Sequence, residues 1–103
     1  MKQFTLLKVS GTIVKSIITD HAWFEAQRRQ IDLELMLSTV ENPQQKVPSK
    51  GNRVVFQSKY YDKINGKEML LRAIVELAGD TFKVISVYKT SKIDKYWIRK
   101  ERA

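Results

Sequence analysis

The sequence contains no cysteine, a single histidine and no apolar run of the roughly 18 residues that a membrane-spanning helix needs. The lack of cysteine excludes disulfide frameworks, thiol catalysis and cysteine-based zinc sites. With only His21 left as a strong nitrogen ligand, we expect no metal site and no other cofactor. Lysine, glutamine and threonine interrupt the first apolar residues, which is unlike a secretion signal. We therefore expect a cytoplasmic protein without a membrane anchor.

Positive charge is in excess and is unevenly distributed. The 103 residues carry 19 Lys and Arg against 11 Asp and Glu, which gives a formal net charge of +8. A chain of this length predicts one domain, residues 1–103, with a modest core. Residues 20–41 carry five acids and two Arg, so this segment is acidic while the rest is strongly basic. Because a positive field concentrates phosphate-bearing ligands, RNA is an expected partner.

The apolar spacing predicts helices in the first half of the chain. Between residues 20 and 42 the apolar side chains recur at intervals of three and four, which indicates two short amphipathic helices. Thr19 or Asp20 is suited to cap the first helix and Asp32 the second. Residues 43–52 hold two Pro and a Gly and predict a loop, with a short extended piece at residues 46–47.

The period then changes to two, which is typical of strands. Residues 53–62, 68–77 and 81–89 are rich in Val, Ile, Tyr and Phe. Residues 4–9 and 13–18 also lean toward strand, with Gly11 allowing a break between them. Residues 91–103 form either a short helix or a final extended segment. We predict an α+β fold in which two N-terminal helices pack on a three- to four-stranded antiparallel sheet, followed by a short C-terminal segment.

Asn65-Gly66 is a strong hairpin signal, and a two-residue loop there fixes a register. That register places Lys59 opposite Arg72. Like charges directly opposite each other destabilise a sheet, so the pair is interpreted either as an anion site or as two side chains splayed into water. We assign phosphate and transition-state stabilisation to Arg72 and Lys59 on the first interpretation.

A second turn at residues 79–80 pairs Glu76 with Lys83, which are of opposite charge. The same count places Tyr88 on the core face of the sheet and Lys89 on the other face. That other face mixes cations and aromatic rings, which is typical of a nucleic-acid platform. Its candidate substrate contacts are Arg53, Tyr61 and Lys89.

His21 is the one side chain whose ordinary pKa lies near neutrality, and it falls at the start of the first helix. A helix N-terminus disfavours the imidazolium, so His21 is a candidate general base or acid for RNA cleavage. The alternative is a polar residue in the first turn that is exposed or bonded to backbone. After the last strand, Lys92 and Tyr96 are candidate substrate contacts, or the segment simply packs on the core.

Four short motifs resemble a known family. They are His21-Ala22, Arg29-Gln30-Ile31, the Arg72-bearing strand 70–75 and the closing segment 84–92 with Tyr88 and Thr90. Over residues 17–97 the chain resembles an uncharacterised prokaryotic domain family within the RelE/ParE-like toxin superfamily, to which BrnT-type toxins also belong. The resemblance adds Arg29 and Thr90 to the expected substrate contacts.

The resemblance implies a type II toxin that cleaves mRNA without metal, usually on the ribosome, and that is controlled by a cognate antitoxin protein. Two other functions stay open on the same scaffold. One is a non-catalytic module that binds RNA or DNA. The other is a toxin that inhibits a protein target such as a topoisomerase.

Overall fold

The structure is a computed structural model that describes residues 3–9 and 12–99, with side chains from residue 15 onward. Its strands and helices, in chain order, are β1 (Gln3–Val9), β2 (Thr12–Ile18), α1 (Asp20–Arg28), α2 (Leu33–Glu41), β3 (Gln45–Pro48), β4 (Arg53–Asp62), β5 (Lys67–Ala78), β6 (Thr81–Thr90) and α3 (Ile93–Tyr96). The predicted break at Gly11 and the last four residues lie outside the described part. Among the described helices, none is long and apolar enough to cross a membrane.

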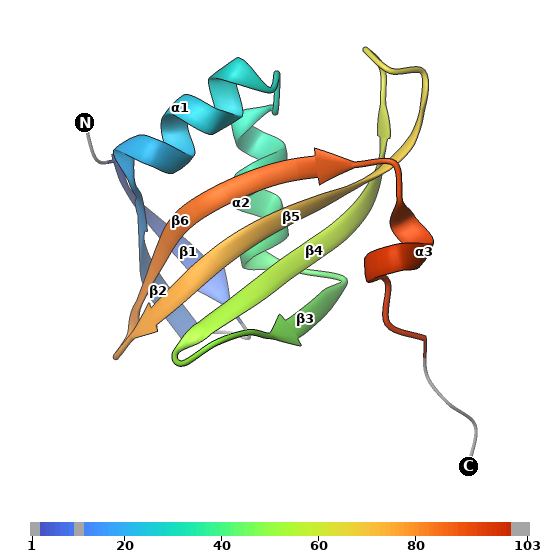
Figure 1. The fold of residues 1–103 in the computed structure, drawn as a ribbon. Coiled ribbons are helices and arrows are strands. Elements are labelled where there is room, and N and C mark those ends of the chain that lie inside the picture. Colours follow the sequence, from blue (N-terminus) through green and yellow to red (C-terminus); the bar gives the residue numbers. More distant parts are fainter. Residues whose placement is uncertain (1–2, 10–11, 100–103) are drawn as a thin grey trace.

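One six-stranded sheet, in the order β1-β2-β6-β5-β4-β3, carries α1 and α2 on one face (Figure 1). We call the opposite face the outer face. All neighbouring strands are antiparallel except β2 and β6, which run parallel. The α+β class is confirmed, but the predicted helix-first chain and three- to four-stranded antiparallel sheet are wrong. Residues 4–9 and 13–18 form strands, as their composition indicates, but periodicity does not reveal that β2 lies beside β6.

The core lies between the two helices and the inner face of the sheet. The helical spacing is confirmed, because α1 turns Ala22 and Ala26 inward and α2 turns Met36 and Val40 inward, each at most 3% exposed. Small side chains on α1 let its backbone approach the sheet closely. The sheet residues of this cluster are Ile18, Phe56, Leu71, Ala73, Val75, Val84 and Val87. Burying each large aliphatic side chain stabilises the fold by about 1.5–3 kcal/mol.

The β4–β5 hairpin has a longer loop than the sequence predicts. Asp62 pairs with Lys67, so residues 63–66 form a four-residue loop in place of the predicted two-residue one. The Asp62 carboxylate accepts the Asn65 N–H at 2.9 Å and its carbonyl accepts the Gly66 N–H at 2.7 Å. Gly66 has φ +66°, a conformation that glycine adopts without strain. The Asp62 side chain therefore closes the loop two residues earlier than the Asn-Gly pair alone would.

This loop shifts the register by two residues. Arg72 lies opposite Gln57, and Lys59 lies opposite Leu70. The predicted Lys59–Arg72 pair is wrong, and with it the argument that two opposed cations need an anion. A shift of two keeps every β4 side chain on its predicted face, because side chains alternate with a period of two.

The β5–β6 hairpin has the predicted turn, with Glu76 opposite Lys83. A bulge follows, because the register shifts by one between Ile74 and Val75. Beyond it, Arg72 lies opposite Tyr88 and Leu71 opposite Lys89. A one-residue shift exchanges the two faces, so the predicted placement of Tyr88 in the core and of Lys89 on the outer face is wrong. Tyr88 lies beside Arg72, and Lys89 points to the helix side.

The C-terminal segment folds back over the outer face. After β6 the chain forms the one-turn helix α3 and then an extended piece to residue 99 (Figure 1). Gln57 donates from its amide nitrogen to the Tyr96 carbonyl at 3.2 Å. The Gln45 side chain donates to the Ile98 carbonyl at 2.6 Å and accepts the Ile98 N–H at 3.0 Å. Two side-chain amides thus hold the segment against β3 and β4.

Candidate nucleic-acid site

Arg72 occupies the middle of the outer face but is only 9% exposed. Its Nε donates to Gln57 Oε1 at 2.9 Å, and its Nη1 donates to the Tyr88 hydroxyl. Its guanidinium also lies 4.2 Å from the centroid of the Tyr96 ring. Arg72 is therefore a buried group that holds Tyr88 and Tyr96, whereas the sequence predicts a surface cation.

Lys59 is also occupied, because its Nζ lies 4.1 Å from the centroid of the Trp97 ring. It lines a cavity of about 490 Å³ together with Lys92 and Lys95. Asp94 and Glu68 line the same cavity and offset much of that charge. The three predicted catalytic residues have different contacts: Arg72 contacts Gln57, Tyr88 and Tyr96, Lys59 contacts Trp97, and His21 contacts Glu25.

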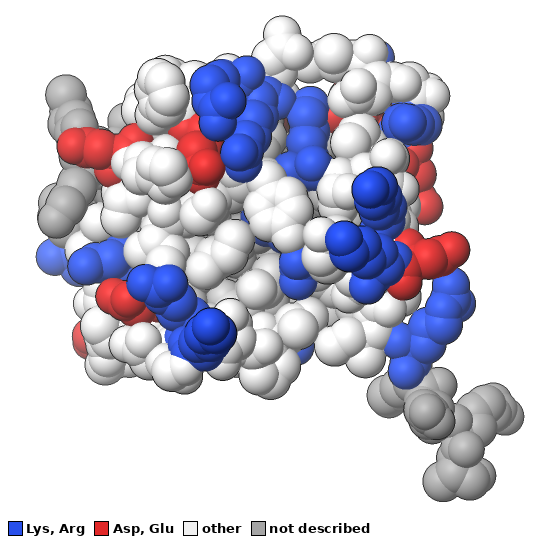
Figure 2. Space-filling model, viewed as in Figure 1, with Lys and Arg blue, Asp and Glu red and all other residues white. Residues whose placement is uncertain are grey.

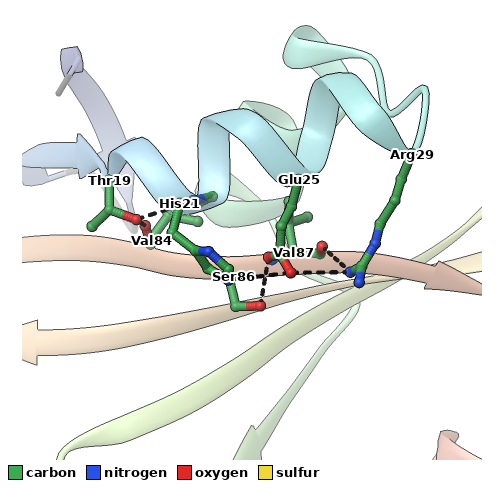
Figure 3. A network of polar contacts seen from close by, with 8 residues as sticks. Thr19, His21, Glu25, Arg29, Val84, Ser86 and Val87 are labelled. Atoms are coloured by element: carbon green, nitrogen blue, oxygen red, sulfur yellow. Dashed lines mark hydrogen bonds and ion pairs between the residues drawn. The ribbon is translucent and has the colours of Figure 1, made fainter. Parts of the chain in front are cut away.

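Helix α1 covers the edge of β6 beyond the point where β2 stops pairing with it at Val84. Figure 3 shows Glu25 and Arg29 reaching from α1 to the strand. Glu25 Oε1 accepts the Ser86 hydroxyl at 2.8 Å and the Val87 N–H at 3.2 Å. Arg29 Nη1 donates to the Val87 carbonyl at 2.9 Å. The two side chains satisfy backbone groups that a neighbouring strand would otherwise pair.

Glu25 is buried, and its charge is balanced from several directions. Burial alone would raise the pKa of Glu25, but hydrogen bonds from Ser86 and Val87 and the charges of Arg29 and His21 lower that pKa below its ordinary value. Its Oε2 lies 3.4 Å from Arg29 Nη1 and 3.2 Å from His21 Nε2. The carboxylate therefore stays ionised and orients both neighbours.

A cavity of about 730 Å³ opens between the end of α1, strand β6 and the β4–β5 loop. We call it the α1–β6 pocket. Its lining residues are Glu25, Arg28, Arg29, Gln30, Ile64, Asn65, Met69, Ser86, Tyr88 and Lys89. The lining holds three cations and one carboxylate; of the cations, Arg29 is paired with Glu25 and Lys89 with Asp62. Figure 2 shows Lys and Arg gathered near the end of α1. A concave site with this balance attracts phosphate.

Lys89, which lines this pocket, belongs to a buried ion pair. Its Nζ lies 2.9 Å from Asp62 Oδ2, and the two side chains are 12% and 5% exposed. Asp62 Oδ2 also accepts the Tyr60 hydroxyl at 2.8 Å. The hydrogen bond from Lys89 holds the pKa of Asp62 well below its usual range. Burial and the neighbouring Asp62 carboxylate raise the pKa of Tyr60 above the ordinary value of a tyrosine.

His21 lies at the start of α1, as predicted, with its imidazole 67% exposed. Its contact with Glu25 places it one side chain away from the α1–β6 pocket, and it does not line that pocket. Arg29, predicted as a substrate contact, lines the pocket while it holds the β6 edge. Lys89 lines it as well, although from the face opposite to the predicted one.

The remaining predicted contacts are dispersed. Arg53 Nε lies 3.6 Å from Glu76 on the surface, and the Thr90 hydroxyl accepts the Lys92 N–H at 3.1 Å. Tyr61 is 66% exposed near the β4–β5 loop. Tyr96 stacks on Arg72 instead of projecting away from the sheet.

The pKa of the Tyr96 phenol is shifted by its neighbours. Burial acts to raise the pKa of Tyr96, but the charges of Lys95 and Arg72 and hydrogen bonds from Lys95 and Tyr88 lower it below its ordinary value. Its ring meets the Tyr88 ring edge-on, with centroids 6.3 Å apart.

Of the ten residues that line the α1–β6 pocket, only Arg29 and Lys89 are predicted from the sequence as substrate contacts. Arg28 and Gln30 flank the predicted Arg29, and helical spacing gives no reason to prefer one of the three. Gln30 is the one described non-glycine residue with positive φ, at 55°. Tyr88 was assigned to the core because the bulge is invisible in the sequence. Within residues 3–9 and 12–99, no group of three or more His, Asp or Glu side chains could hold a metal ion.

Comparisons of the chain with protein-family models, with curated proteins and with solved structures give no match. The strongest feature of the site is the α1–β6 pocket, which is lined by Arg28, Arg29, Lys89 and Tyr88.

Proposed function

We propose that this protein is a small basic ribonuclease that binds RNA in the α1–β6 pocket and cleaves it without a metal ion, in the manner of RelE/ParE-like toxins. The observation that carries the proposal is the convergence of Arg28, Arg29 and Lys89 on one cavity that also holds Tyr88. A phosphodiester needs cationic donors for its oxygens and a proton carrier within reach. The pocket supplies both.

The chemistry is an internal transfer at phosphorus. The RNA 2′-hydroxyl loses its proton and its oxygen bonds to phosphorus, while the bond from phosphorus to the 5′-oxygen breaks and that oxygen gains a proton. Arg28 stabilises the charge that develops on the phosphoryl oxygens, and Arg29, which stays paired with Glu25, adds to the positive field. Tyr88, whose hydroxyl receives a hydrogen bond from Arg72, is the proton carrier in the wall. His21, oriented by Glu25 beside the pocket, is the second carrier.

Two partners belong to this proposal because the resemblance implies them. One is mRNA, including mRNA on the ribosome. The other is a cognate antitoxin protein that covers the toxin until it is removed.

The test uses purified protein and a 5′-labelled single-stranded RNA in a buffer with a chelator. Cleavage to fragments that end in a 2′,3′-cyclic phosphate is the expected result, and Tyr88→Phe is expected to slow it by about a hundredfold, as for loss of a general acid or base. RNA that stays intact, free and on ribosomes, overturns the ribonuclease proposal.

A non-catalytic RNA-binding module is the second candidate, and one observation favours it. Arg72 and Lys59 are held against Tyr96 and Trp97, so neither is free to stabilise a transition state directly. Salt-dependent binding of RNA that leaves it uncut supports this candidate over the first.

A further inference from the structure

A second, smaller cavity adjoins the α1–β6 pocket. It has a volume of about 410 Å³ and shares Gln30 and Ile64 with the pocket, so these two residues form a common rim. Its lining includes the apolar residues Ile31, Leu35 and Ile64 and the two tyrosines Tyr60 and Tyr61. We call it the Tyr61 cavity. Unlike its neighbour, it carries two carboxylates and one lysine in its lining.

The charge of the Tyr61 cavity excludes a phosphate from it. Asp62 is neutralised by Lys89, but Asp32 and Lys63 leave no net positive charge for an anion. The apolar wall and the tyrosine face suit a flat ring, since bases of single-stranded RNA stack on aromatic side chains. Tyr61 is 66% exposed, so its side chain is accessible to a base from solution.

Asp32 adds a hydrogen-bonding preference. It occupies the N-cap position of α2, yet its side chain makes no cap hydrogen bond. An N-cap aspartate ordinarily accepts a backbone N–H of the first helical turn. Asp32 lines the Tyr61 cavity, and its carboxylate has two acceptors and no donor to offer a ligand there.

We propose that the Tyr61 cavity binds the base next to the phosphate held in the α1–β6 pocket, and that it selects guanine. Guanine presents two adjacent N–H donors on its Watson–Crick edge, which a carboxylate accepts together. Uracil presents one donor between two carbonyl oxygens, which the carboxylate repels. This inference rests on the proposed RNA binding and adds the identity of the base to it.

The experiment measures binding of five 2′-deoxy pentanucleotides by fluorescence anisotropy, because without the 2′-hydroxyl they cannot be cut. The central residue is guanine, adenine, cytosine, uracil or an abasic site, and the flanking bases are uracil. We expect the guanine strand to bind about tenfold more tightly than the uracil strand, as for one bidentate pair. The abasic strand should bind most weakly.

Two variants and one control locate the effect. Asp32→Asn should remove the guanine preference, because an amide presents a donor as well as an acceptor. Tyr61→Ala should weaken every strand with a central base by about tenfold and leave the abasic strand unchanged. Ile98→Ala is the control, because Ile98 is a large apolar residue that is 49% exposed but lines neither cavity, and it should change nothing.

The outcomes separate the two proposals. Equal binding of all five strands, or a guanine preference that survives Asp32→Asn, overturns base selection and leaves RNA binding in place. Loss of affinity for every strand in Arg28→Ala, the abasic one included, is expected from the phosphate contact. If wild-type protein binds none of the strands and no RNA of any length, both proposals fail together.

Discussion

The buried pair of Asp62 and Lys89 allows a sharp test of how the fold is held together. Replacing Asp62 with Asn removes the negative charge and leaves the Lys89 ammonium, 12% exposed, without its counter-ion. Breaking a buried pair by removing one partner costs about 3–5 kcal/mol. Since Lys89 retains some solvent and a contact with the Gln30 carbonyl, we expect a loss of about 3 kcal/mol.

The measurement is the free energy of unfolding in urea, followed by tryptophan fluorescence. Asp94→Asn is the control, because Asp94 pairs with Arg99 at 2.7 Å but both side chains are largely exposed. An exposed pair contributes about 0–1 kcal/mol despite its shorter distance. If both variants lose the same free energy, burial does not govern the strength of these pairs and the reasoning is refuted.

The same pair makes stability depend on pH. The pKa of Asp62 is lower in the folded protein than in the unfolded chain, so its contribution is fully present above the unfolded pKa near 3.8. The contribution is lost as the pH falls below that value toward the folded pKa. The difference in unfolding free energy between wild type and Asp62→Asn should therefore shrink on acidification from pH 6 to pH 3.

Two further substitutions test local features, each by thermal and urea unfolding. Gln30→Gly should stabilise the fold by about 1 kcal/mol, because glycine adopts a φ of 55° without strain and the backbone carbonyl that Lys89 contacts is retained; a destabilisation would contradict this. Glu25→Gln should lose about 1–3 kcal/mol, since an amide accepts from Val87 and Ser86 more weakly and leaves Arg29 without its ion pair. An unchanged stability would show that the β6 edge does not need the carboxylate.

The helices and strands could be predicted because each has a periodicity of its own. The pattern of Ala22, Ala26, Met36 and Val40 depends only on the helical turn, and the inner face of β4 depends only on alternation. Strand neighbours depend on residues far apart in the chain. The pairing of β2 with β6 therefore cannot be predicted from the sequence, although the composition of both segments favours strands.

The errors at the site come from two side-chain and backbone details. Asp62 lengthened the first hairpin loop, which separated Lys59 from Arg72. The bulge near Ile74 exchanges the faces of Tyr88 and Lys89, so the sequence predicts Tyr88 in the core, whereas it lines the α1–β6 pocket. No pattern in the printed sequence reports a bulge, because its signal is one unpaired residue within an otherwise regular strand.

The net charge of +8 predicts an anionic partner but not where it binds. The structure divides the cations between the α1–β6 pocket, the contacts of the outer face and surface pairs such as Arg53 with Glu76. The location of the site therefore depends on tertiary contacts, which composition cannot supply.

The most direct test of RNA cleavage in the α1–β6 pocket compares two variants that each remove one positive charge. Arg28 lines the pocket, whereas Arg53 lies in a surface pair with Glu76. Rates of cleavage of one labelled RNA are measured for wild type, Arg28→Ala and Arg53→Ala in the presence of a chelator. We predict a loss of at least about tenfold for Arg28→Ala and little change for Arg53→Ala. Equal losses in the two variants, or no cleavage by the wild type, would contradict the account.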